Sequence, residues 1–156
     1  MNIIGTYECK ADSKGRLMLP SPLKKQLTAT LEEGFVLKRS VFAKCLELYP
    51  MGEWNRAMAT VNGLNRFVRK NVDFIRQFTA GVKIVELDNT ARLLIPKDLS
   101  DFAGIGSNIV LASAGNYIEV WDKVAYEAVL NNPQVDFAQL AEEVMGNLNA
   151  TGDVIP

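Results

Sequence analysis

The stretch DSKGRLMLP at residues 12–20 recurs as DNTARLLIP at residues 88–96. Both copies contain an acidic residue, an arginine four positions later, three large apolar residues and a proline. The segments that follow also correspond, since LELY at residues 46–49 is matched by IEVW at residues 118–121. A duplicated unit of this length usually packs against its other copy to complete one core. The chain is therefore expected to form one pseudo-symmetric domain.

Each copy predicts two strands joined by a tight turn. Residues 6–11 alternate between polar and apolar side chains, as a half-buried strand does. Residues 12–15 have the composition of a turn, because aspartate can bond to its own backbone and glycine can adopt positive φ. Residues 16–19 are the expected returning strand and Pro20 ends it. Ser21 is expected to cap the short helix that follows.

After this hairpin, each copy predicts a short helix, two more strands and a further helix. Helical spacing of apolar residues also predicts helices over 64–78 and from 137 onwards. Two such units, when interleaved, would give a closed eight-stranded barrel without free edges. The predicted fold class is α+β, mainly β, with flanking helices. The predicted organisation is a first repeat at 1–80, a second repeat at 81–145 and a frayed tail at 146–156.

Composition excludes several kinds of site. The chain has no histidine, which removes the commonest general base, and it has no phosphate-binding glycine motif. Cys9 and Cys45 are expected to be buried, reduced thiols, and no metal or cofactor is predicted. An enzyme that uses the two acid–arginine pairs is a weak alternative, because no nucleophile lies beside either pair in the sequence. With no membrane-length apolar stretch and no signal-peptide pattern, a cytoplasmic location is expected.

Charge is distributed unevenly along the chain. Residues 1–80 contain 13 Lys and Arg against 7 Asp and Glu, whereas residues 81–156 contain 4 against 11. The basic half can attract phosphate although the net charge is −1, because screening over about 8 Å makes local charge decisive. Alternatively, the two halves attract each other within or between chains. An arginine on a narrow hairpin suits DNA, since its planar fork can bond to guanine in the major groove.

The motif pair, the stretch at residues 5–16 and the LELYP run at 46–50 together resemble the MraZ family over roughly residues 1–145. That family is related to AbrB-type swapped-hairpin barrels. The resemblance implies a cytoplasmic, nucleoid-associated, ring-shaped homo-oligomer that binds repeated sites in promoter DNA through its Asp-x-x-x-Arg hairpins. It implies a repressor of the bacterial division and cell wall gene cluster. A DNA-free, ring-forming assembly protein is the alternative.

The candidate DNA-binding residues lie at and near the first turn. The resemblance assigns this role to Asp12, Lys14 and Arg16, and charge adds Lys10 and Lys24 as phosphate contacts. In the second copy the resemblance assigns Asp88 and Arg92. This copy has threonine and alanine in place of Lys14 and the turn glycine. Asp88 and Arg92 are therefore expected to serve mainly in barrel structure or a subunit contact, with DNA binding as the second possibility.

Overall fold

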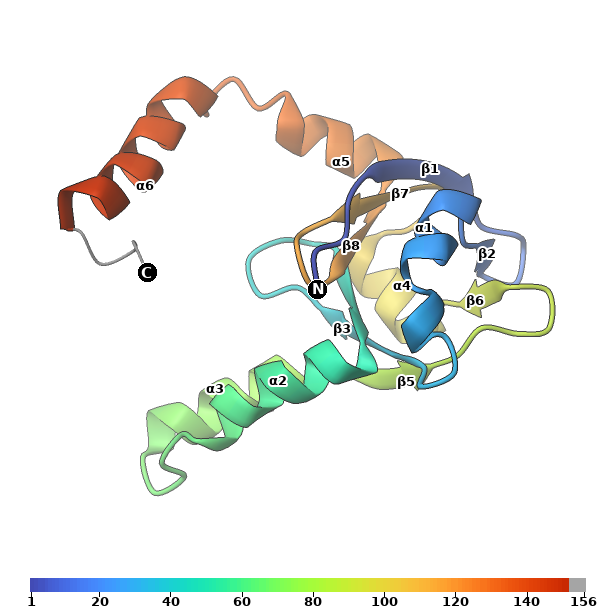
Figure 1. Ribbon diagram of the computed structural model, residues 1–156, viewed down its shortest axis with the longest axis horizontal. Helices are drawn as coiled ribbons and strands as arrows, with labels where there is room; N and C mark the ends of the chain where they lie inside the picture. The colour runs from blue at the N-terminus through green and yellow to red at the C-terminus, as the bar shows by residue number, and fades with distance from the viewer. Residues whose placement is uncertain (152–156) are drawn as a thin grey trace. The chain divides into compact units, whose positions relative to one another are not determined.

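The strands of the chain pair mainly between the two copies of the repeated unit (Figure 1). The computed structural model describes the backbone of residues 1–151 and the side chains of residues 1–148. In chain order, its elements are β1 (Thr6–Lys10), β2 (Arg16–Met18), α1 (Ser21–Gln26), the short 3-10 helix η1 (Thr28–Thr30), β3 (Phe35–Arg39), β4 (Leu46–Pro50), α2 (Met51–Asn62), α3 (Arg69–Thr79), β5 (Lys83–Val85), β6 (Arg92–Leu94), α4 (Lys97–Ala103), β7 (Asn108–Ser113), β8 (Ile118–Asp122), α5 (Lys123–Leu130) and α6 (Phe137–Thr151).

Strand pairing confirms the interleaved, mixed α+β arrangement. The first strand of each copy pairs with the third strand of the other, so that β1 joins β7 and β5 joins β3, both antiparallel. The second strands, β2 and β6, pair with each other, and so do the fourth strands, β4 and β8. Each hairpin is thereby exchanged between the copies, and the β2–β6 ribbon contains one strand of each motif.

The sequence had suggested one continuous closed barrel, but the strands do not form one. They form a six-stranded sheet in the order β1-β7-β8-β4-β3-β5 and a separate two-stranded sheet, β2-β6. Single bridges, Ala11 with Leu17 and Leu87 with Leu93, are the links between the sheets among the described strands. The reason is local, because β2 and β6 are only three residues long and the motif aspartate side chains take up backbone N–H groups at the turns.

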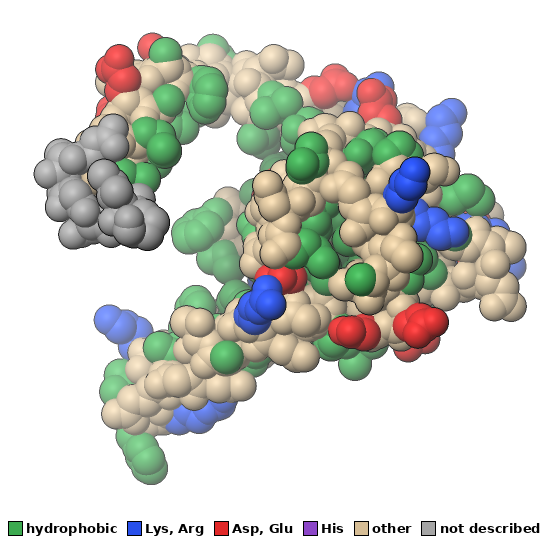
Figure 2. All heavy atoms as spheres, in the orientation of Figure 1, with side chains coloured by type: hydrophobic (Ala, Val, Ile, Leu, Met, Phe, Trp, Pro, Cys, Tyr) green, Lys and Arg blue, Asp and Glu red, His purple; other side chains and the backbone are tan. Residues whose placement is uncertain are grey.

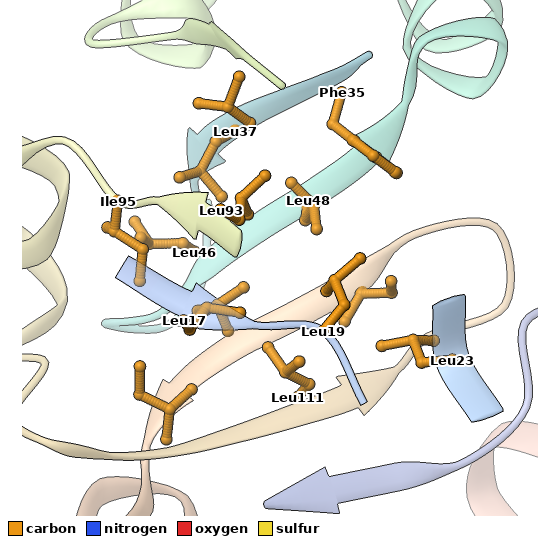
Figure 3. Packing of buried hydrophobic residues seen from close by; sticks show 14 of the residues in the cluster. Leu17, Leu19, Leu23, Phe35, Leu37, Leu46, Leu48, Leu93, Ile95 and Leu111 are labelled. Carbon is orange, nitrogen blue, oxygen red and sulfur yellow. The ribbon is translucent and has the colours of Figure 1, made fainter. Parts of the chain in front are cut away.

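The interior between the two sheets is filled by large aliphatic side chains. Leu17 and Leu93, at equivalent positions of the two motifs, are each 1% exposed and point into this core (Figure 3). Leu19 and Ile95, two positions later, are also buried. One face of the motif strands is therefore packed into the core, so their other face must point away from it.

The short helices start one residue earlier than a serine cap would require. Helix α1 begins at Ser21 itself, and the preceding Pro20 holds the N-cap position without a side-chain capping bond. Helix α4 begins in the same way after Pro96. Both prolines have extended backbone angles, with ψ of 140° and 144°, so the same residue ends the strand and starts the helix. The prediction that Ser21 caps the helix was wrong.

Helices α2 and α3 lie side by side as a helical hairpin (Figure 1). Trp54 of α2 stacks on Phe78 of α3, with 6.0 Å between the ring centroids. The helix predicted over 64–78 begins only at Arg69, because Asn65 organises a turn before it. The Asn65 side chain accepts a bond from the N–H of Phe67 at 2.9 Å.

The outer face of the six-stranded sheet contains a buried ion pair. Lys38 of β3 and Glu47 of β4 are cross-strand neighbours, with 3.7 Å between Nζ and Oε1. Lys38 is 0% exposed and lies 4.3 Å from the centroid of the Phe78 ring, and Tyr49 donates a 3.2 Å hydrogen bond to Glu47. Burial lowers the pKa of the Lys38 ammonium. Cys45 is buried beside this row, and its burial raises the pKa of the thiol to about 12.

The chain divides into two compact units, residues 1–126 and 127–156. The second unit contains the end of α5 and helix α6, whose apolar side chains include Phe137, Leu140 and Val144, all exposed. Of the tail predicted at 146–156, residues 146–151 belong to α6 and 152–156 lie outside the described residues.

Within the described part of the chain, no helix combines the length and apolar character that crossing a membrane requires.

Candidate nucleic-acid interface

The first turn is organised by the carboxylate of Asp12. Its Oδ1 atom accepts hydrogen bonds from the backbone N–H groups of Lys14 and Arg16, both at 2.9 Å. Its Oδ2 atom accepts a 2.8 Å bond from Nε of Arg16. The backbone closes the turn from Gly15 N–H to the Asp12 carbonyl at 3.0 Å. One side chain therefore holds the turn backbone and also the direction of the arginine.

The second turn has the same architecture despite its different residues. Asp88 Oδ1 accepts bonds from the backbone N–H groups of Thr90 and Arg92 at 2.9 Å, and Oδ2 accepts a 3.2 Å bond from Nε of Arg92. Thr90 adds a hydroxyl bond to Oδ1 at 2.9 Å. Ala91 adopts a φ of 62°, the left-handed region that Gly15 occupies at 82°. The replacement of glycine has therefore not changed the shape of the turn.

The two turns lie at the two ends of the short β2–β6 ribbon, and each is bonded to the opposite motif. The N–H of Ile95 donates to the Gly15 carbonyl at 2.9 Å, and the N–H of Leu19 donates to the Ala91 carbonyl at 3.3 Å. Arg92 also approaches Asp12, with 3.8 Å between Nη1 and Oδ2. The structure thus brings together the two acid–arginine pairs, which are separated by more than 70 positions in the sequence.

The outer side of the β2–β6 ribbon displays both arginines on one surface. Register places Arg16 opposite Leu94 and Met18 opposite Arg92. Since Leu17 and Leu93 point into the core and strand side chains alternate, these four residues share the opposite face. We call this surface the ribbon face and define it as Arg16, Met18, Arg92 and Leu94.

Both motif carboxylates are held in the charged form. The backbone N–H bond from Arg16 is the main cause that lowers the pKa of Asp12. The equivalent bond from Arg92 lowers the pKa of Asp88 to about 2. Each arginine therefore faces an ionised partner at neutral pH, and the charge-assisted bond restrains its side chain. Arg16 and Arg92 remain about one-third exposed, at 30% and 32% of their side-chain surface.

The predicted lysines differ in how they relate to the first turn. Lys10 ends β1 and Lys14 lies in the turn, and both are exposed. Lys24 is exposed on α1. Two grooves border the first turn, and they are lined by α4 and its flanking residues, including Ile95 and Ser100. Lys24 is not among the described residues that line them. Figure 2 shows Lys and Arg side chains over the region of α1 and β2.

A family model described as "MraZ protein, putative antitoxin-like" matches residues 3–74 and 78–148, one match for each copy of the repeat. The chain belongs to the MraZ family. A protein from Flavobacterium psychrophilum named "Transcriptional regulator MraZ" is 67% identical over 147 residues, which is 94% of each chain. One of the same name from Christiangramia forsetii is 65% identical over 94% of this chain and 95% of its own. A third, from Bifidobacterium longum, is 29% identical over 92% of each.

Sequence reasoning about this MraZ family member missed the ribbon face. It treated each turn separately, because nothing in the motif itself indicates that β2 pairs with β6. Met18 and Leu94 are apolar like their neighbours in the motif, yet they are 56% and 50% exposed. Strict alternation within the three-residue strand would have placed them outside. The buried Lys38–Glu47 pair was also missed, since a charged residue within an apolar strand looks exposed.

Proposed function

We propose that this chain is a sequence-specific DNA-binding regulator that contacts the major groove of promoter DNA with its ribbon face. The observation that supports it most is the pairing of β2 with β6, which presents both motif arginines on one exposed surface. A two-stranded β ribbon is narrow enough to enter the major groove. The names of the relatives support a role in transcription regulation.

The geometry of each arginine suits recognition of guanine. Nε of Arg16 is bonded to Asp12, which leaves the two terminal nitrogens of its guanidinium available to another partner. Those nitrogens form a planar fork that matches the O6 and N7 acceptors of guanine. Because the side chain is already restrained by Asp12, less rotamer entropy is lost on binding.

We propose that the second turn contacts DNA in the same way as the first. Its turn shape and the Asp88–Arg92 bond match those of the first copy, and Arg92 lies on the same ribbon face. This revises the expectation that the second copy serves mainly in structure. A single chain would then offer two arginines, related by pseudo-two-fold symmetry, to one stretch of duplex.

Lysines around the turns are proposed to contact phosphates. Lys10 and Lys14 belong to the first turn and its strand, and Lys24 corresponds to Ser100 in the repeat. Ser100 lines the grooves beside the first turn. By pseudo-symmetry, α1 should take the same position beside the second turn, so Lys24 would supply the positive charge that Thr90 does not.

Self-association is the second part of the proposal. Apolar side chains are exposed on the helical hairpin, where Phe67 is 100% and Phe74 43% exposed, and also on α6. Residues 127–156 contain acidic but no basic residues, whereas α3 contains Arg69, Lys70 and Arg76 against a single acidic residue. We propose that copies join head to tail into a closed ring, which lets linked hairpins bind repeated DNA sites. From the family resemblance, we propose repression of the division and cell wall gene cluster, at the nucleoid.

The test begins with a duplex selected from a random DNA pool by the wild-type protein. Replacing Arg16 by Ala should lose about 1–3 kcal/mol of binding free energy and relax base preference at one position. Replacing Lys14 or Lys24 by Ala should weaken binding to all duplexes by a similar factor. It should also reduce, by about 1, the slope of the logarithm of the binding constant against the logarithm of the salt concentration. Lys44→Ala, in the exposed β3–β4 loop and away from both motif turns, is the matched control. A folded Arg16→Ala protein that binds as tightly as wild type would contradict the proposal.

A DNA-free assembly protein is the alternative, and the exposed apolar surface of α3 and α6 favours it. In that case the charge asymmetry would serve ring closure only. Measuring affinity for duplex DNA between about 50 and 200 mM salt separates the two, because phosphate contacts make binding strongly salt-dependent. Absence of any salt-dependent duplex binding by the assembled protein would favour the alternative.

A further inference from the structure

Two exposed apolar residues occupy equivalent positions of the repeat on the ribbon face. Met18 follows Asp12 by six residues, and Leu94 follows Asp88 by six. Both are about half exposed, at 56% and 50%, although neighbouring residues on either side are buried. An exposed strand position is usually polar, and a single apolar exception needs no explanation. The same exception in both copies, between two charged turns, indicates a contact that requires apolar side chains.

The register places each of these residues beside the arginine of the other copy. Leu94 is directly opposite Arg16, and Met18 is directly opposite Arg92. Side chains directly opposite each other in an antiparallel pair have Cβ atoms about 4.5–5.5 Å apart. Backbone bonds between Gly15 and Ile95, and between Ala91 and Leu19, hold this arrangement at both ends of the ribbon. Any base edge bonded to one arginine therefore has an apolar side chain beside it.

We propose that Met18 and Leu94 contact the methyl groups of thymines next to the bases bonded by Arg92 and Arg16. The thymine C5-methyl is the apolar group that base edges offer in the major groove, and apolar side chains are its usual partners. The inference rests on the proposed DNA-binding function and extends it to base preference. It assigns each half of the binding site a guanine accompanied by a thymine, with two halves related by the pseudo-two-fold symmetry of the ribbon.

Deoxyuridine tests this directly, since it differs from thymidine only by that methyl group. Each thymine of the selected duplex is replaced in turn, and binding is measured for wild type, Met18→Ala and Leu94→Ala. At the contacted positions, removing the methyl should weaken wild-type binding roughly three- to fivefold. Met18→Ala should lose the effect at one position and Leu94→Ala at another. Phe42→Ala, which alters a 98% exposed side chain in the β3–β4 loop, should retain both effects.

The outcomes separate this inference from the function on which it rests. If deoxyuridine duplexes bind wild type as tightly as thymidine duplexes while Arg16→Ala still weakens binding, the methyl contact is wrong and the DNA-binding function stands. Full sensitivity to deoxyuridine in both alanine variants would also overturn the contact. If wild type binds no duplex selectively, the function and the inference fail together. Circular dichroism melts check that the variants are folded, as expected for exposed positions.

Discussion

At the scale of single residues, Gly15 and Ala91 occupy the same backbone position in the two turns, but only the glycine suits the conformation that this position requires. Both have positive φ, which costs an alanine about 1–2 kcal/mol. We therefore expect Ala91→Gly to stabilise the protein by up to about 1 kcal/mol. Gly15→Ala should destabilise it by about 1–2 kcal/mol, because its new Cβ would also lie 3.3 Å from the carbonyl of Ile95. Urea unfolding measures both, and equal signs for the two changes would contradict the shared turn geometry.

The motif carboxylates give a pH dependence of known sign. Hydrogen bonds lower the pKa of Asp88 to about 2 in the folded chain, whereas an unfolded aspartate has a pKa of about 3.9. Its stabilisation is therefore present above about pH 4 and is lost as the pH falls toward 2. Carboxyl NMR titration should find the pKa of Asp88 well below the value of about 3.9 expected for an unfolded aspartate. A pKa near 3.9 for Asp88 would contradict the hydrogen-bond network.

At the scale of elements, the six-stranded sheet depends on the Lys38–Glu47 pair across β3 and β4. Glu47→Gln should destabilise the protein by about 3–5 kcal/mol, because it leaves the ammonium of Lys38 buried without its charged partner. Adding Lys38→Met should recover most of that loss, since the amide introduced at position 47 can still accept the bond from Tyr49. The measurement is a double-mutant cycle in denaturant, in which additive losses would show that the two residues are not coupled.

The sequence predicted many elements but not how the two copies pair. The two strands that follow the hairpin in each copy were predicted, and β3 at Phe35–Arg39 is one of them, because an apolar run between turn residues indicates a strand. The motif turns were also predicted, since Asp12 and Asp88 act within a few residues of themselves. The β2–β6 ribbon depends instead on contacts between distant residues, such as Leu17 with Leu93, and local patterns do not contain that information. The ribbon face could therefore be found only in three dimensions.

At the scale of the whole molecule, we expect a closed homo-oligomer. Light scattering of the purified protein should give a multiple of 17.2 kDa at micromolar concentration, in low and in moderate salt. Phe67→Ser combined with Phe74→Ser should reduce the assembly by removing exposed apolar surface. Asn55→Ala, at an exposed position of α2 on the same helical hairpin, is the control. A monomer under both salt conditions would contradict the ring and the account of repeated-site binding.

The central claim is that both motif arginines contact guanine from one ribbon, and 7-deazaguanine tests it most directly. This base lacks the N7 acceptor and keeps the rest of guanine. Each guanine of the selected duplex is replaced in turn, and affinities are compared for wild type, Arg16→Ala and Arg92→Ala. We predict loss of wild-type affinity at two guanines, with one effect absent in Arg16→Ala and the other absent in Arg92→Ala. Unchanged wild-type affinity for every substituted duplex would contradict the claim.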